Sequence, residues 1–237
     1  MKVLLIHGHN RKGSTYHIVR MLEDELEKRG SVDCLDEVFI PQIIQNGCIG
    51  CYSCIESEEK CPYYKQKMQI MDLIEKADML IFTTPTYCMA PSSQMKQFMD
   101  LTFTYWMPHK PRAFMFQKKA VVITTAAGSG CNEAIAPIAR MLFYWGVPFV
   151  KKYGVTVQAM SWDDVTEKRK QKIAKDMRVL ARKLSDPKPP SVGFKTKFMF
   201  FMMRMMQKNN MGSGPKERDY WESMGWLGKD RPWKKKE

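Results

Sequence analysis

The 237-residue sequence lacks any apolar run of the roughly 18 residues that a membrane-crossing helix requires. Its first apolar stretch, residues 1–6, ends at His7-Gly8-His9-Asn10 without the small-residue cleavage site of a secretory signal. The sequence also has no internal repeat, and no Ser/His/Asp or paired-carboxylate arrangement typical of nucleophilic or acid–base catalysis. We therefore expect neither a secreted nor a membrane-spanning protein, and the sequence predicts a cytoplasmic location.

The formal net charge of +13 is unevenly distributed along the chain. Residues 1–150 carry 16 Lys and Arg against 15 Asp and Glu, whereas residues 151–237 carry 22 against 10. Such a basic region can attract phosphates, anionic lipid or an acidic protein partner, or can simply be a solvated surface. Because the N-terminal two thirds are nearly neutral, no nucleic-acid partner is expected.

Short apolar segments alternate with amphipathic ones along the first 185 residues. This pattern predicts an α/β fold, a doubly wound five-stranded parallel sheet over 1–185 with a cysteine-bearing insertion at 41–62. A basic, Met- and aromatic-rich C-terminal appendage follows at 186–237, predicted as a helix plus a flexible basic tail. The expected strands are 2–7, 32–40, 77–84, 120–125 and 147–157. The expected helices are one capped by Ser14 or Thr15 that runs to residue 29, one capped by Ser92 or Ser93, 132–145 and 163–184.

The loop after the first expected strand, residues 8–15, suits a phosphate group. A helix start offers free N–H donors and the positive end of a dipole, and Ser14 and Thr15 add hydroxyl donors. A serine stands where the lysine of a nucleotide-triphosphate loop belongs, so an NTPase is not indicated. The loop is also compatible with an ordinary capped turn.

Two further loops lie at expected strand ends, where ligands of open α/β sheets bind. Residues 84–91 combine a rigid proline with the aromatic Tyr87, which could form a wall for a planar ring. Residues 125–130 are small and allow close approach of the backbone. Together, three such loops favour one flavin mononucleotide (FMN).

Four cysteines, Cys48, Cys51, Cys54 and Cys61, crowd into 14 residues, and Pro62 follows the last. Three-residue spacing is typical of [4Fe–4S] ligation, whereas structural zinc uses two Cys-x2-Cys pairs with a longer spacer. An iron–sulfur cluster is therefore favoured over zinc or reduced, unliganded thiols. Cys34, Cys88 and Cys131 have no partner at ligand spacing, and no neighbouring base indicates a nucleophilic role for Cys88.

These segments, in order, resemble a known family. The residues that carry the resemblance are Gly8-His9-Asn10-Arg11 with Ser14-Thr15, the cysteine run, Ala77-Asp78, Thr84-Pro85-Thr86-Tyr87 and Met95-Lys96-Gln97-Phe98-Met99-Asp100. Together they resemble the NAD(P)H-dependent FMN reductase branch of flavodoxin-like proteins, and more narrowly the iron–sulfur flavoproteins of anaerobic microbes.

The resemblance implies a flavodoxin-like fold, FMN, a [4Fe–4S] cluster beside it, NAD(P)H as co-substrate, and a homo-oligomer, either dimer or tetramer. Carried over by position, the cofactor contacts would be His9, Asn10, Arg11, Ser14, Thr15, Pro85, Thr86, Tyr87, Cys88, Thr125, Ala126, Ala127 and Gly128, and the cluster ligands would be Cys48, Cys51, Cys54 and Cys61. The expected function is electron transfer between a two-electron donor, FMN and the cluster. The alternatives are a cluster-free NAD(P)H-dependent FMN or quinone reductase, and a non-catalytic electron carrier that docks on a redox protein partner.

The appendage contains an apolar run, residues 198–206, between Lys195 and Lys208. We expect a helix that packs on its own domain or on a second copy, with methionine as adaptable filler. The alternative is a helix lying at a membrane surface, since basic flanks beside an apolar run are typical of peripheral contact. The run is too short to span a bilayer.

Overall fold

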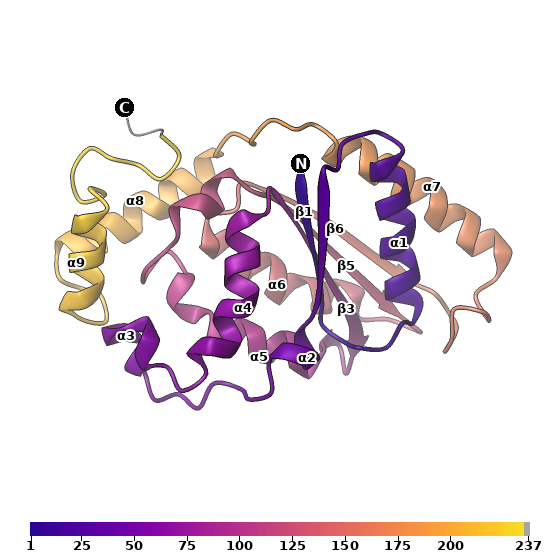
Figure 1. Ribbon diagram of the computed structural model, residues 1–237, viewed down its shortest axis with the longest axis horizontal. Helices are drawn as coiled ribbons and strands as arrows, with labels where there is room; N and C mark the ends of the chain where they lie inside the picture. The colour runs from indigo at the N-terminus through magenta and orange to yellow at the C-terminus, as the bar shows by residue number, and fades with distance from the viewer. Residues whose placement is uncertain (235–237) are drawn as a thin grey trace.

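The computed structural model describes residues 1–234 and has three layers, a sheet between two layers of helices (Figure 1). The parallel strands are β1 (Lys2–His7), β2 (Cys34–Phe39), β3 (Met79–Tyr87), β5 (Lys119–Ala126) and β6 (Phe149–Thr156), in the order β2-β1-β3-β5-β6. The short β4 (Ala90–Pro91) pairs antiparallel with the end of β3. The predicted doubly wound, five-stranded sheet with a flavodoxin-like arrangement is confirmed.

Alternation along the strands divides the core between the two faces of the sheet. Leu4, Leu80 and Val122 point into one apolar cluster, under α4 (Tyr64–Lys76), α5 (Ser93–Leu101) and α6 (Cys131–Trp145). Leu5, Ile81 and Val121 point into the other, under α1 (Ser14–Glu27) and α7 (Glu167–Leu184). The strands are apolar on both faces because helices cover both.

The connection from β2 to β3 differs most from the expectation. It contains α2 (Ile40–Ile43), α3 (Ser53–Glu56), the 3₁₀ turn η1 (Glu58–Lys60) and then the 13-residue helix α4, which is not among the expected helices. The inward face of α4 consists of Lys67, Ile70, Met71 and Ile74, so a charged residue begins the apolar stripe and obscures its periodicity. α4 supplies the crossover that a parallel β2-β1-β3 arrangement requires.

Three predicted helix starts have different outcomes. Ser92 caps α5 as expected, and its hydroxyl accepts a hydrogen bond from the Met95 amide at 3.3 Å. α1 begins instead after Gly13, with no side-chain cap, so the prediction that Ser14 or Thr15 caps it was wrong. α7 begins at Glu167 rather than at residue 163, the expected start.

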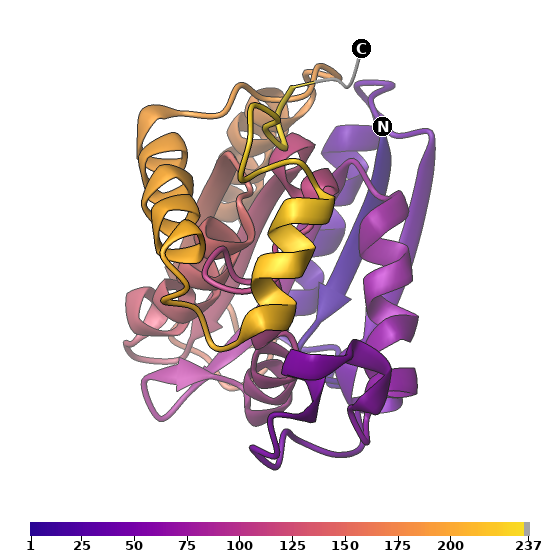
Figure 2. The ribbon, with the colours of Figure 1, turned by 90° about the vertical axis from the view of Figure 1, so that its left-hand side faces the viewer.

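The segment after residue 186 packs against the rest of the chain through its own apolar cluster. It contains α8 (Phe194–Lys208) and α9 (Pro215–Ser223), the second of which was not predicted. Phe200, Trp221 and Trp226 are buried against Met107 and Phe116, which precede β5 in the chain near η2 (Phe103–Tyr105) and η3 (Ala113–Gln117). Figure 2 shows α9 in front of this region, with α8 beside it at the edge of the molecule. The division at residue 185 stays a prediction, and the end of the predicted basic tail, 235–237, lies outside the described residues.

No helix within residues 1–234 combines the length and the apolar character needed to cross a bilayer.

Candidate functional site

A cavity of about 220 Å³ opens beyond the carboxyl ends of β1, β3, β5 and β6. This is the edge of the sheet where ligands of open α/β folds bind. Ten of the thirteen residues predicted to contact a cofactor line it: His9, Arg11, Ser14, Thr15, Pro85, Thr86, Tyr87, Thr125, Ala126 and Ala127. Asn10, Cys88 and Gly128 are not among the lining residues, so their predicted contacts have no counterpart in this cavity.

The N-terminus of α1 forms one side of the cavity. Gly13 occupies the cap position without a side-chain hydrogen bond to the first turn, and therefore leaves amide donors there for a ligand. Thr15 is buried, and its hydroxyl lies 2.6 Å from that of Thr125 at the end of β5. The Arg11 guanidinium donates to the Met160 carbonyl at 2.8 Å and so ties this loop to the one after β6. Free amides, hydroxyl groups and a positive dipole end suit an anionic group such as a phosphate.

His7, the last residue of β1, lies at the base of the cavity and is almost fully buried. Burial and the nearby Arg20 guanidinium lower the pKa of His7 to about 4, so the ring is neutral at neutral pH. Its Nε2 lies 2.8 Å from a Glu37 carboxylate oxygen, and its Nδ1 lies 2.8 Å from the Thr83 hydroxyl. An ionised carboxylate only accepts, so Nε2 carries the proton and Nδ1 accepts from Thr83. The ring is thereby held in one tautomer.

A tight hairpin forms the wall beside β3, within the loop predicted at residues 84–91. Tyr87 pairs with Ala90, and the two residues between them, Cys88 and Met89, both have positive φ, 49° and 59°. This is the backbone form of a two-residue hairpin turn that usually takes Asn or Gly. Tyr87, at the start of the turn, lines the cavity and contacts the His9 ring edge-on at a centroid distance of 5.8 Å.

The four clustered cysteines lie apart from this cavity, because no residue of 41–62 lines it. Cys48 and Cys51 are exposed, Cys61 is half-buried and Cys54 is buried. Burial raises the pKa of the Cys54 thiol, and the charges of Cys61 and Cys48 raise it further, whereas the charge of Lys67 acts in the opposite direction. Within residues 1–234, however, no three His, Cys, Asp or Glu side chains are grouped so that they could hold a metal ion. The donors are of the right kind for a cluster, but they are not arranged around a common centre.

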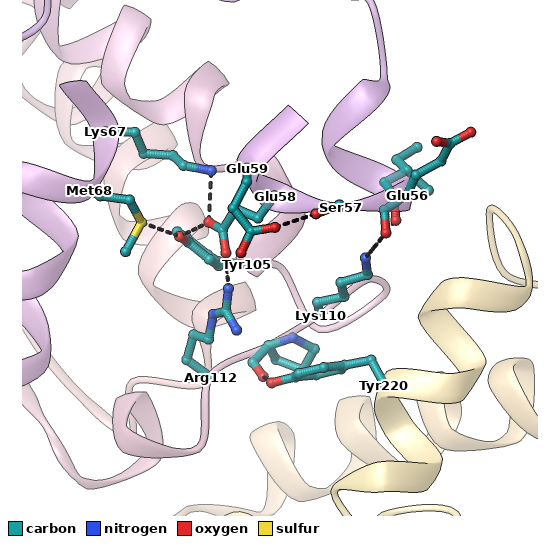
Figure 3. Close-up of polar contacts among 12 residues, drawn as sticks. Glu56, Ser57, Glu58, Glu59, Lys67, Met68, Tyr105, Lys110, Arg112 and Tyr220 are labelled. Atoms are coloured by element: carbon teal, nitrogen blue, oxygen red, sulfur yellow. Dashed lines mark hydrogen bonds and ion pairs between the residues drawn. The ribbon is translucent and has the colours of Figure 1, made fainter. Parts of the chain in front are cut away.

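A buried ionic network holds the cysteine loop against the body of the protein (Figure 3). Glu58, between Cys54 and Cys61, pairs with Lys67 of α4 at 2.7 Å and with Arg112, and accepts a hydrogen bond from the Tyr105 hydroxyl. The Lys67 side chain is fully buried. Burial alone would raise the pKa of Glu58, but the charges of Arg112 and Lys67 outweigh it and the pKa is lowered.

A second contact, from Lys110, also holds the cysteine loop in place. The Lys110 ammonium donates to the Ile55 carbonyl at 2.5 Å, at the end of α3. Burial lowers the pKa of Lys110, while the charges of Glu217, Glu58 and Cys54 act in the opposite direction. Three cationic side chains, Lys67, Lys110 and Arg112, thus hold the segment between two of the predicted cluster ligands.

Comparison with known proteins agrees with this geometry. Residues 1–160 match the family model described as "NADPH-dependent FMN reductase". The chain belongs to this family. Its members are FMN-dependent oxidoreductases with a flavodoxin-like fold, as the resemblance implied.

Similar curated proteins carry the name iron–sulfur flavoprotein. One from Archaeoglobus fulgidus is 30% identical over 149 residues, which are 62% of this chain and 64% of that protein. One from Clostridioides difficile is 25% identical over 194 residues, which are 81% of this chain and 83% of that protein. The match thus spans less than two thirds of the Archaeoglobus protein.

Solved structures show the same fold at low sequence identity. An azoreductase from Bacillus anthracis str. Sterne superposes with a TM-score of 0.62 at 11% identity, covering 77% of this chain and 99% of that one. An NADH:FMN oxidoreductase in its apo form superposes with a TM-score of 0.57 at 16% identity, covering 81% of this chain and 95% of that one.

Gly13 lies within the predicted phosphate loop, and six residues outside the predicted contacts also line the cavity of this FMN reductase family member: His7, Tyr16, Thr83, Val157, Ala159 and Met160. The last three follow β6, whose carboxyl end reaches the same edge of the sheet as those of β1, β3 and β5. The rule that ligands bind at strand ends could have indicated this fourth loop. No motif marks it.

Proposed function

We propose that the cavity beyond the strand ends binds one FMN, and that the protein is an FMN-dependent oxidoreductase using NAD(P)H as electron donor. The observation that carries this proposal is the convergence of ten predicted contact residues, from three separate loops, on one cavity. The family match over residues 1–160 supports the same cofactor. The flavin supplies the redox chemistry, and the protein supplies placement and electrostatics.

In this proposal the phosphate of FMN lies at the N-terminus of α1. The uncapped first turn, the Ser14 hydroxyl and the Arg11 charge would hold it. Pro85, Tyr87 and the small residues Ala126 and Ala127 would border the ring, where apolar surface excludes water. His7, being neutral, would add no positive charge to the cofactor cavity at neutral pH.

Substitution of serine by aspartate at the first residue of a helix tests the phosphate site with a matched control. Ser14 begins α1 and Ser93 begins α5, and a carboxylate at either position complements the helix dipole. Only Ser14→Asp places negative charge where the phosphate would bind. We expect Ser14→Asp to weaken FMN binding at least 100-fold, measured by quenching of flavin fluorescence, while Ser93→Asp leaves it unchanged.

Riboflavin, which lacks the phosphate, provides the second measurement. The wild-type protein should bind FMN much more tightly than riboflavin, and Ser14→Asp should abolish that preference. A wild-type protein that binds neither flavin, or a preference that survives Ser14→Asp, contradicts the proposed site. Steady-state oxidation of NADH and NADPH by the FMN-loaded protein then distinguishes the enzyme from a non-catalytic carrier, which would show negligible turnover without a partner.

We further propose that Cys48, Cys51, Cys54 and Cys61 hold a [4Fe–4S] cluster. The support consists of their spacing and the names of the two curated relatives. A cluster so held would supply one-electron transfer. Because the four thiols are not gathered around one centre, this proposal requires residues 48–61 to rearrange when the cluster assembles.

Chemical analysis tests the cluster directly. Protein reconstituted without oxygen should contain iron and acid-labile sulfide at four each per chain and show a broad visible absorption that dithionite bleaches. Cys51→Ser should lose both, whereas Cys34→Ser, an exposed cysteine outside the run, should retain them. Protein that carries flavin and is fully active without iron is instead a cluster-free FMN or quinone reductase.

A further inference from the structure

Helix α8 is apolar on its outward face as well as on the face that packs against the protein. Thr196, Phe200 and Gln207 are buried and mark the face that packs on the protein. At 100° per residue, the opposite face is centred between residues 198 and 205. That outward face is apolar as well, although the outward face of a helix on a globular protein is normally polar.

Five large apolar side chains form this outward stripe, and each is substantially exposed. Their relative exposures are Phe194 80%, Phe198 53%, Phe201 49%, Met202 45% and Met205 38%. Each lies three or four residues from at least one other member of the stripe, and at 100° per residue the five cover an arc of about 100°. The rings of Phe194 and Phe198 stack on each other at a centroid distance of 6.1 Å.

Lysines border the stripe on both sides. Lys197 and Lys208 lie along one edge and Lys195 along the other, and all three are exposed. Residues 187–216, which include the whole of α8, contain six basic residues and no acidic one. Of the six, Arg204 is occupied by the carbonyls of Trp226, Leu227 and Gly228, which fix α8 to the following segment. Exposed lysines therefore flank the stripe on both edges, and α8 itself carries no acidic residue.

The apolar stripe and the lysines at its edges indicate whether a second copy of α8 or a lipid surface covers this face. If α8 paired with itself across a two-fold axis, lysines would face lysines with no acidic residue of the segment to neutralise them. An anionic lipid surface instead offers apolar chains for the stripe and negative head groups for lysines at its edges, whose stems can extend toward the water. We propose that the outward face of α8 docks this protein on an anionic membrane surface, with the helix axis in the plane of the lipid head groups.

The position of α8 permits this contact. In Figure 2 it runs along the outside of the molecule, and within residues 1–234 no other element covers its outer side. No residue of α8 lines the cavity at the strand ends, so docking would leave that cavity open. The two proposals are independent of each other.

Co-sedimentation with vesicles tests the proposal on the full chain. We expect the protein to pellet with vesicles of phosphatidylcholine containing about one third phosphatidylglycerol, and to stay in solution with phosphatidylcholine alone. Phe198→Glu with Phe201→Glu should weaken the binding at least tenfold. Its control is Val179→Glu, which adds charge at an exposed apolar residue of α7 and should bind as the wild type does.

A double variant that removes two lysine charges tests the electrostatic contribution to vesicle binding. Lys195→Gln with Lys197→Gln should weaken binding to the anionic vesicles at least tenfold, since each surface lysine accounts for about a fivefold change. Lys168→Gln with Lys172→Gln, which removes two exposed charges from α7, should have no such effect. Circular dichroism and thermal unfolding verify that every variant is folded.

Three results would overturn the proposal. The first is an absence of pelleting with the anionic vesicles, and the second is binding that persists in Phe198→Glu/Phe201→Glu. The third comes from light scattering: an oligomer that does not pellet and that dissociates in this variant would make the α8 face an interface between copies of the chain.

Discussion

The Glu58 network predicts a large and specific loss of stability when its single carboxylate is neutralised. Glu58→Gln preserves size but removes the charge that compensates Lys67, whose side chain is fully buried, and Arg112. Breaking one side of a buried ion pair costs about 3–5 kcal/mol. Because the side chains of Glu58 and Arg112 are 17% and 28% exposed, we expect the lower end, about 3 kcal/mol in the free energy of unfolding.

Urea denaturation measures this loss, and hydrogen exchange of residues 53–60 shows whether the cysteine loop opens first. The double variant Glu58→Gln/Lys67→Met should be more stable than Glu58→Gln alone by about 1–2 kcal/mol, because it removes the buried charge left without a partner. Glu56→Gln is the control: its pair with Lys60 is fully exposed and should contribute nothing measurable. If the losses in the free energy of unfolding of Glu58→Gln and Lys67→Met, measured singly, add up to the loss of the double variant, the two side chains are not coupled and the reasoning is refuted.

The same carboxylate predicts a pH dependence with a definite sign. Since the pKa of Glu58 is lowered in the folded state, its contribution is full above the ordinary glutamate value of 4.5 and is lost as the pH falls through the folded value. The acid limb of the stability profile should therefore be steeper in the wild type than in Glu58→Gln. Equal slopes below pH 4.5 would contradict the assigned direction.

Three further outcomes are expected. His7→Asn should flatten the pH dependence of apoprotein stability between pH 6.5 and 4: in the wild type the unfolded chain takes up a proton there and the folded one does not, which costs roughly 2–4 kcal/mol by pH 4 in urea titrations. Gly146→Ala should lower stability by roughly 2–4 kcal/mol in the same assay, because φ is 93° there and an added Cβ would lie 2.4 Å from the Phe116 ring; a loss below 1 kcal/mol would mean that Phe116 moves aside. Ser92→Ala should cost about 1–2 kcal/mol in thermal unfolding, since its hydroxyl caps α5 and donates to the Gly8 carbonyl at 2.6 Å.

Local signals in the sequence determined the sheet and most of its helices. The strands are continuous apolar runs because helices bury both of their faces, and such runs are visible without any structure. The loops at positions 8–15, 84–87 and 125–127 could be assigned to one site, because parallel strands carry all their carboxyl ends to one edge. The family followed from the order of residues 8–15, the cysteine run, 77–78, 84–87 and 95–100 along the chain.

Only the tertiary structure decided the features that depend on residues distant in the chain. Helix α4 was missed because Lys67 begins its inward face, and that lysine is buried only because Glu58 meets it there. The fourth loop of the cavity, with Met160, carries no motif and reaches the site through the position of β6 at the sheet edge. The apolar run 198–206 was visible in the sequence, but which of its side chains face outward depends on where Trp221 and Trp226 pack, and no local pattern encodes that.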